Sequence, residues 1–238
     1  MPNTADHIVR SFTDELNALN QQIARMGGHT EQILEDSVQA LLRRDADVAM
    51  RAIEADRKVD GLDAEVENEV VRLIALRQPM ANDLRVIVSA LKISQSLERI
   101  GDHAKNGAKR ALIINRDPPM EQTRGILRLS EVARDLLRDV LNAHANMDPE
   151  AALRVRDRDE DLDTLYDGYF RECLTYMMED SRSISATAHL LFIAKNLERI
   201  GDQCTNIAEN IYYVATGERV GSARPRDDAL DPSRTQGV

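Results

Sequence analysis

The sequence predicts an all-α protein, a tandem repeat of two three-helix bundles with six long helices in all. The main observation is a hexapeptide, Leu-Glu-Arg-Ile-Gly-Asp, which occupies residues 97–102 and recurs letter for letter at residues 197–202. The chance of such a recurrence is on the order of one in a thousand, so duplication is the better explanation. Apolar residues recur at helical spacing, and no segment shows the alternating β-branched pattern of a strand.

The first copy is expected to hold three helices. In the first of them, apolar residues recur at helical spacing at Ile23, Met26, Ile33, Leu34, Val38 and Leu41. Gly27-Gly28 interrupts that stripe and either bends the helix or breaks it, and the sequence leaves both outcomes open. Asp45 is expected to cap the second helix, which runs to about Gln78. The third helix follows Pro79 and ends near Ile114.

The second copy repeats this arrangement. Asp148 is expected to cap its second helix, because Pro149 suits the first helical position that follows. That helix runs to about Asp180. The third helix follows Ser183 and ends near Thr216.

These boundaries divide the chain into three parts. Residues 1–116 form the first repeat, 117–218 the second, and 219–238 a tail that is expected to be flexible because its composition is polar and aperiodic. The copies align at an offset of 103 around residues 56–60, but at an offset of 100 in the hexapeptide. The first copy therefore has three extra residues near Pro79, which are expected to lengthen a loop.

Composition narrows the class of protein. The chain has 238 residues, 42% of them hydrophobic, which is enough for a globular core. Its formal net charge of -10 repels polyanions, so nucleic acid is not an expected partner. No run approaches the roughly 18 apolar residues that cross a bilayer, and the N-terminus lacks the apolar segment of a signal peptide. A cytoplasmic location is therefore expected, with Cys173 and Cys204 as reduced, buried thiols.

Paired carboxylates are the candidate functional feature. Glu98 and Asp102 are four residues apart and share one helix face, and Asp56 and Asp60 form a second such pair on the preceding helix. Like charges at this spacing destabilise a helix by about 0.2–0.5 kcal/mol per pair, so a compensating positive group is expected. The second copy repeats both pairs as Asp159, Asp163, Glu198 and Asp202.

Helix packing can turn these pairs into a site. If the second and third helices of a bundle lie side by side, their two acidic pairs converge on one group of four carboxylates. Such an all-oxygen group suits hard cations such as iron, manganese, magnesium or calcium. Asn106 and Asn206, one turn after each hexapeptide aspartate, are weaker candidate ligands. His103 is not expected to be a shared ligand, because Gln203 replaces it in the second copy.

The hexapeptide glycines add a second signal. Gly101 and Gly201 lie inside predicted helices, where Gly costs roughly 0.5–1 kcal/mol relative to Ala. Their presence predicts the close approach of another helix or of a ligand. The alternative interpretation is that the carboxylates form solvated helix faces, with Arg99 and Arg199 as ion-pair partners, and that the glycines only ease helix packing.

At these residues the chain resembles the PhoU family, the accessory regulators of phosphate-specific transport. The resemblance runs from about Met26 to Tyr213. Besides the two hexapeptides, the segments that carry it are Arg77-Gln78-Pro79, Asp83-Leu84-Arg85 and residues 176–182. Similarity to this family implies two three-helix bundles and multinuclear clusters of iron, or of zinc or manganese, one per repeat. The four carboxylates of each copy would be the metal ligands.

The resemblance also implies a role and partners. It implies a cytoplasmic, membrane-peripheral protein that restrains phosphate uptake and signals phosphate sufficiency to a sensor histidine kinase. The implied partners are that kinase and the ATPase subunit of the phosphate ABC transporter. Broad helical surfaces also make a homodimer an expectation.

Three classes of function remain to be compared. The leading hypothesis is a non-enzymatic, metal-binding adaptor of phosphate regulation. An enzyme such as a di-iron carboxylate oxidase is disfavoured, because it requires Glu-x-x-His pairs that the sequence lacks. The third interpretation is a metal-free helical scaffold with solvated acidic faces. Equal thermal midpoints with and without chelator would favour the scaffold.

Overall fold

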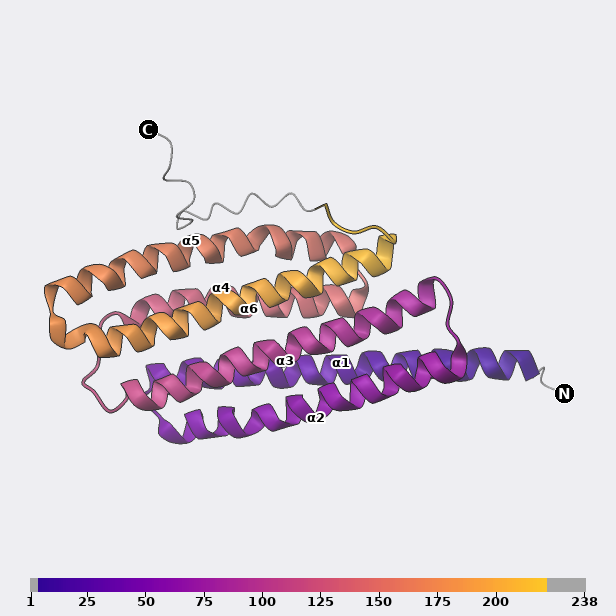
Figure 1. The fold of residues 1–238 in the computed structure, drawn as a ribbon, viewed down its shortest axis with the longest axis horizontal. Coiled ribbons are helices and arrows are strands. Elements are labelled where there is room, and N and C mark those ends of the chain that lie inside the picture. Colours follow the sequence, from indigo (N-terminus) through magenta and orange to yellow (C-terminus); the bar gives the residue numbers. More distant parts are fainter. Residues whose placement is uncertain (1–3, 222–238) are drawn as a thin grey trace.

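The computed structural model describes residues 4–221, with side chains from residue 12 onward. This part of the chain contains six long α-helices, one short 3-10 helix and no strand. The elements are α1 (Thr4–Leu42), α2 (Ala46–Arg77), α3 (Asn82–Ile114), α4 (Thr123–Asn146), α5 (Pro149–Glu179), η1 (Ser181–Ser183) and α6 (Ile184–Thr216). Helices α1 to α3 form one bundle and α4 to α6 the other (Figure 1). The predicted fold is confirmed, whereas most of the predicted tail at 219–238 lies outside the described residues.

Both predicted N-caps are confirmed. Asp45 has an extended backbone, and its carboxylate accepts hydrogen bonds from two backbone N–H groups in the first turn of α2, at 2.9 and 3.1 Å. Asp148 does the same at the start of α5, at 3.0 and 2.9 Å. Each cap satisfies N–H groups that have no partner inside the helix, which fixes where the two helices begin.

Gly27 and Gly28 do not break α1, which is one continuous helix of 39 residues. A Cβ on Gly27 would lie 2.6 Å from Cδ2 of Leu141, so the missing side chain allows α4 to pack closely against α1. Nothing lies within 4 Å of the equivalent position on Gly28. The interruption of the apolar stripe therefore marks the contact between the first helices of the two repeats.

The three extra residues of the first repeat lengthen its helices, so the prediction of a longer loop is wrong. The connection from α2 to α3 spans residues 78–81, and the connection from α5 to α6 spans residues 180–183. Helix α2 has 32 residues and α5 has 31. Helix α3 begins fifteen residues before Leu97, whereas α6 begins thirteen residues before Leu197. Because the helices absorb the insertion, the first hairpin reaches further from its hexapeptide.

Helices α3 and α6 run antiparallel and join the two repeats (Figure 1). Near the start of α3, the guanidinium carbon of Arg85 lies 5.9 Å from the ring centroid of Tyr213, near the end of α6. At the opposite ends of the pair, Arg110 lies 4.4 Å over the ring of Phe192. The two hexapeptides therefore lie opposite each other midway along the pair.

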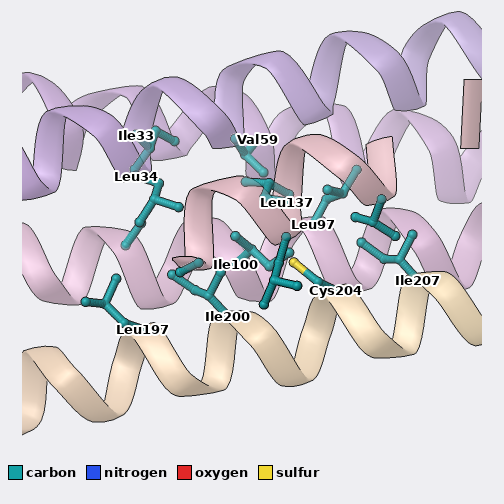
Figure 2. Packing of buried hydrophobic residues seen from close by; sticks show 14 of the residues in the cluster. Ile33, Leu34, Val59, Leu97, Ile100, Leu137, Leu197, Ile200, Cys204 and Ile207 are labelled. Carbon is teal, nitrogen blue, oxygen red and sulfur yellow. The ribbon is translucent and has the colours of Figure 1, made fainter. Parts of the chain in front are cut away.

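One continuous apolar core fills the space between the repeats. Ile100 of α3 belongs to the same buried cluster as Ile200 and Cys204 of α6 and Leu34 of α1 (Figure 2). Cys173 and Cys204 are both buried free thiols, as predicted. Among the described residues, no helix is both long and apolar enough to cross a membrane. The shared core holds the two hexapeptide helices, and the acidic residues on them, in fixed positions.

Candidate functional site

The predicted acidic residues lie in two groups, one in each repeat. The repeat-1 cluster lies on α2 and α3 and consists of Asp56, Asp60, Glu98 and Asp102. The repeat-2 cluster lies on α5 and α6 and consists of Asp159, Asp163, Glu198 and Asp202. The first aspartate of each cluster is buried, the second is exposed, and the two residues from the third helix are partly exposed. Each cluster therefore has one carboxylate below the surface and three nearer to solvent.

The hexapeptide glycines make room for the buried aspartates. A Cβ on Gly101 would lie 3.1 Å from Oδ1 of Asp56. A Cβ on Gly201 would lie 2.2 Å from Oδ1 of Asp159, which is closer than a Cβ and a non-bonded oxygen can lie in a folded protein. The predicted close approach of another helix at these glycines is confirmed, and what approaches is the carboxylate itself.

A lysine completes the repeat-1 cluster. Nζ of Lys105 donates to Oδ2 of Asp56 on α2 and to Oδ1 of Asp102 on its own helix, which makes two ion pairs. Burial raises the pKa of Asp56, and the Lys105 ammonium opposes that rise. Burial acts to lower the pKa of Lys105, but the hydrogen bonds to Asp102 and Asp56 outweigh it and hold that pKa above its ordinary value. Within the described residues, Oδ1 of Asp56 accepts no hydrogen bond.

Glu98 is close enough to the other carboxylates to be affected by their charges. Burial raises the pKa of Glu98, and the charges of Asp102, Asp60, Asp63 and Asp56 raise it further. Carboxylates from α2 and α3 therefore repel one another across the helix interface, which is the electrostatic setting in which a bound cation is most favourable.

Asp63 is an additional acidic residue that the comparison of the two copies missed. Ser94 Oγ donates a hydrogen bond to Asp63 Oδ1 at 2.7 Å, which links α3 to α2 beside the cluster. Asp63 lies seven residues after Asp56 and so shares its helix face, a spacing that could have identified it. A comparison of the two copies does not detect Asp63, because the equivalent position in the second repeat is Tyr166.

The repeat-2 cluster has equivalent carboxylates and different partners. Thr205 stands at the position equivalent to Lys105, and its hydroxyl donates to Oδ2 of Asp159 at 3.1 Å. Nζ of Lys195 lies 2.6 Å from Oε1 of Glu198, one turn along the same helix. Burial raises the pKa of Glu198, the Lys195 charge opposes that rise, and neighbouring carboxylates of the cluster add to it.

Two lysines contact the clusters. The alternative interpretation named Arg99 and Arg199 as ion-pair partners. Both arginines are exposed. The compensating charge that the paired carboxylates require is thus supplied at least in part by Lys105 and Lys195. Lys105 lies seven residues after Glu98 and so on the same helix face. This spacing could have predicted a lysine beside the cluster.

The weaker candidates lie at the edge of the clusters. Asn106 and Asn206 are exposed, so neither amide is enclosed with a buried aspartate. The side-chain amide of Asn206 donates to Oε1 of Gln203 at 3.3 Å. His103, which was not expected to be a shared ligand, is partly buried, and both burial and the nearby Arg199 charge lower its pKa.

The clusters suit a hard cation in their chemistry, but their side chains must move to bind one. Every donor in them is an oxygen, which iron, manganese and magnesium accept. As the described residues stand, no three Asp, Glu, His or Cys side chains are arranged to hold one ion. Oδ1 of Asp56 could supply a ligand atom without losing a hydrogen bond. An ion between Asp56 and Asp102 would have to displace Lys105.

Known proteins have similar sequences and a similar fold. A family model described as the PhoU domain matches the chain twice, at residues 23–111 and 126–211. The phosphate-specific transport system accessory protein PhoU homolog of Caulobacter vibrioides is 50% identical over 226 residues, covering 94% of this chain and 98% of that protein. The accessory protein PhoU of Escherichia coli is 39% identical over 221 residues, covering 91% and 90%. The crystal structure of PhoU from Pseudomonas aeruginosa matches with a TM-score of 0.85 and 35% identity over 87% of this chain and 100% of that chain. The chain belongs to the PhoU family.

Proposed function

We propose that this protein is the accessory regulator of a phosphate-specific transport system, in which it restrains phosphate uptake and phosphate-starvation signalling. The observation that carries this proposal is the extent of the match to a relative named as a phosphate-specific transport system accessory protein, at 50% identity over 94% of this chain. The protein acts by binding partners and not by catalysis. It works in the cytoplasm and reaches the membrane through those partners.

Two docking partners belong to this role: the ATPase subunit of the phosphate ABC transporter and a sensor histidine kinase. Exposed apolar side chains at the ends of the two helical hairpins support docking, because exposed apolar patches mark protein–protein contacts. At the α2–α3 end and the α5–α6 end respectively, they are Leu76, Met80 and Leu84, and Leu174, Met178 and Ile184. The two hairpins lie at opposite ends of the molecule (Figure 1), so one protein can present both surfaces.

A binding experiment with purified partners tests the docking. The ATPase subunit and the cytoplasmic part of the kinase are immobilised, and binding of the wild-type protein is compared with that of Met80→Asp and Met178→Asp. We expect each variant to lose on the order of tenfold in affinity for the partner that its hairpin contacts. Met50→Asp, on an exposed part of α2 away from the hairpin, is the matched control. Wild-type protein that binds neither partner rejects the docking proposal.

A strain that lacks the protein tests the regulatory role separately. We expect phosphate uptake and a starvation-responsive reporter to remain high in phosphate-rich medium and to fall when the wild-type gene is restored. Unchanged uptake and reporter activity in the deleted strain would reject negative control, whatever the binding experiment gives. Self-association into a homodimer stays a prediction, which sedimentation of the purified protein can test.

We also propose that the acidic clusters bind a hard metal cation, with iron as the first choice and zinc or manganese as alternatives, as multinuclear clusters. The buried aspartates and the raised pKa values of Glu98 and Glu198 support this, because a bound cation would offset the repulsion among the carboxylates. The candidate ligands are the four carboxylates of each cluster. Metal analysis of the native protein tests the proposal, together with Glu98→Ala, Glu198→Ala and the exposed control Glu160→Ala. Metal-free protein in every preparation, including preparations loaded with iron or manganese, rejects it.

A metal-free helical adaptor is the second candidate function. The observation that favours it is the pairing of the acidic residues with Lys105 and Lys195, since these ammonium groups already offset part of the repulsion. The two candidates differ in one simple property. Only a protein that binds metal in its folded state becomes less stable when a chelator removes the metal.

A further inference from the structure

We propose that Lys105 is the resident cation of the repeat-1 cluster, so that the two repeats neutralise equivalent carboxylates in different ways. Repeat 1 uses its own lysine, which excludes metal from that cluster and narrows the metal binding proposed above from both clusters to repeat 2. The statement about repeat 2 rests on the metal binding proposed above. The statement about Lys105 stands on the contacts of that residue alone.

The Lys105 ammonium lies where the carboxylates of α2 and α3 meet. Its Nζ contacts one carboxylate oxygen from each helix, Oδ2 of Asp56 and Oδ1 of Asp102. The lysine side chain is only 18% exposed and that of Asp56 only 3%. A metal ion that joined α2 to α3 would need these two carboxylates, and it would need them at the position where the ammonium lies.

An incoming ion at this position must displace the ammonium or lie beside it. Displacement leaves a largely buried Lys105 without its partners, which is strongly unfavourable. If the ammonium stays, two positive charges a few ångströms apart repel each other in a region of low dielectric constant. Lys105 therefore competes with a metal ion for the oxygens of Asp56 and Asp102.

Repeat 2 has an uncharged residue at the equivalent position. The hydroxyl of Thr205 donates to Asp159 there, and hydroxyl and carboxylate oxygens suit a hard cation. The lysine of repeat 2, Lys195, contacts Glu198 on its own helix and is 41% exposed. Lys195 also lies over the ring of Tyr166, at 5.0 Å from its centroid. Because Lys195 is more exposed than Lys105 and its ion pair lies within one helix, it hinders an incoming ion less.

Exchange of the two residues tests where metal binds, with Mn²⁺ alone as the probe and metal-stripped, full-length protein. We expect Lys105→Thr to double the Mn²⁺ stoichiometry of the wild type and Thr205→Lys to abolish binding. Because Thr205 is buried, Asp202→Asn serves in its place if Thr205→Lys does not fold, and it should also abolish wild-type binding. Lys109→Thr, an exposed lysine one turn further along α3, is the control and should leave the stoichiometry unchanged.

Two outcomes overturn this division between the repeats. One is a Lys105→Thr protein that binds Mn²⁺ with the same stoichiometry as the wild type, because Lys105 would then not be what keeps metal out of repeat 1. The other is wild-type binding that falls as much with Glu98→Gln as with Glu198→Gln, since Glu98 belongs only to the repeat-1 cluster.

A metal-free measurement tests the lysine independently. In excess chelator we expect Lys105→Met to lower the thermal midpoint by roughly 5–10 °C, and to do so far less in an Asp56→Asn background. The same fall in both backgrounds, or no fall in either, overturns the role of Lys105 as resident cation. If no variant binds Mn²⁺ and the coupling to Asp56 is found, the metal binding proposed above fails while Lys105 is upheld as the resident cation.

Discussion

Gly201 lies so close to Asp159 that a Cβ on the glycine would be 2.2 Å from Oδ1 of the aspartate. The equivalent distance in repeat 1, from Gly101 to Asp56, is 3.1 Å. Each hexapeptide glycine is thus part of the acidic cluster, because it provides the space that the buried carboxylate fills. A helix-interior glycine, which destabilises a helix by roughly 0.5–1 kcal/mol relative to alanine, is explained by that space.

Replacement of these glycines should therefore affect the two repeats unequally. We expect Gly201→Ala to lower the free energy of unfolding by about 1–3 kcal/mol, because the new methyl group meets both Asp159 and a methyl carbon of Leu162 at 2.7 Å. Gly101→Ala should lower it less, since a Cβ there would lie 3.1 Å from its nearest neighbour and the gain of about 0.5–1 kcal/mol in helix propensity offsets the remaining cost. Urea denaturation measures both variants.

A glycine in open space provides the control for these substitutions. Nothing lies within 4 Å of a Cβ on Gly168 in α5, so Gly168→Ala should raise the free energy of unfolding by about 0.5–1 kcal/mol. A Gly201→Ala protein as stable as the wild type would show that Asp159 can move aside. The glycine would then not be required to make room for the buried carboxylate.

The charge of Glu198 should destabilise the metal-free protein near neutral pH. Burial raises its pKa in the folded state. A group with a raised folded-state pKa contributes stability while it is protonated, below its unfolded pKa, and that contribution is lost as the pH rises through the folded-state pKa. We therefore expect Glu198→Gln to stabilise the chelated protein relative to wild type at pH 7, and to lose that advantage near the unfolded pKa of about 4.5.

Denaturation of chelated protein at the two pH values checks this prediction. Glu160→Gln, which changes an exposed carboxylate on α5, should show no such pH dependence. Excess metal should reverse the sign of the Glu198→Gln effect at pH 7, because a bound cation favours the ionised carboxylate. A variant that is less stable than the wild type at pH 7 in chelator would contradict the prediction.

Arg77 should hold the amino-terminal half of α1 on the first bundle by the shape of its side chain as well as by its charge. Its Nε and Nη2 donate to the two carboxylate oxygens of Glu15 at 2.9 and 2.8 Å. Lysine cannot make this two-point contact. We therefore expect Arg77→Lys to speed amide hydrogen exchange in residues 12–19 at pH 7, whereas Arg72→Lys, which alters a more exposed arginine, should have a smaller effect.

The same contact sets a pH dependence of the opposite sign. The hydrogen bond from Arg77 lowers the pKa of Glu15. A carboxylate whose folded-state pKa is depressed contributes stability above its unfolded pKa, and this is lost as the pH falls through the folded-state value. Protection factors of residues 12–19 should therefore converge for wild type and Arg77→Lys once the pH falls below the lowered folded-state pKa of Glu15. A difference that persists in acid would assign the effect of Arg77 to packing.

The sequence was sufficient for the helices because local rules decide them. Asp45 and Asp148 satisfy N–H groups in the next turn, so their role needed no knowledge of the other helices. The continuity of α1 through Gly27 could not be predicted, since the packing of Leu141 from another repeat decides it. Nor could the alignment of the copies show that extra residues near Pro79 lengthen helices, because an alignment counts residues without placing them.

The composition of the acidic clusters was only partly predictable for a similar reason. The spacing of Glu98 and Asp102 places them on one face, and a comparison of copies selects features that both copies share. Lys105 and Asp63 differ from their counterparts, Thr205 and Tyr166. A comparison that selects shared residues therefore leaves out the residues in which the two repeats differ. Whether Lys105 reaches Asp56 depends on the rotation and separation of two helices, which the sequence of either helix does not contain.

Removal of metal should separate the two candidate functions most directly. A ligand that binds only the folded state stabilises it by about 2.7 kcal/mol at one hundred times its Kd, which for a chain of this length is a thermal shift of roughly 5–10 °C. We expect chelator to lower the thermal midpoint of the iron- or manganese-loaded wild type by an amount of this order, and to leave Glu198→Ala almost unchanged. Glu160→Ala, which keeps the repeat-2 cluster, should respond as the wild type does. Equal midpoints with and without chelator for the loaded wild type would favour the metal-free adaptor, because no tightly bound ion could then contribute to folding.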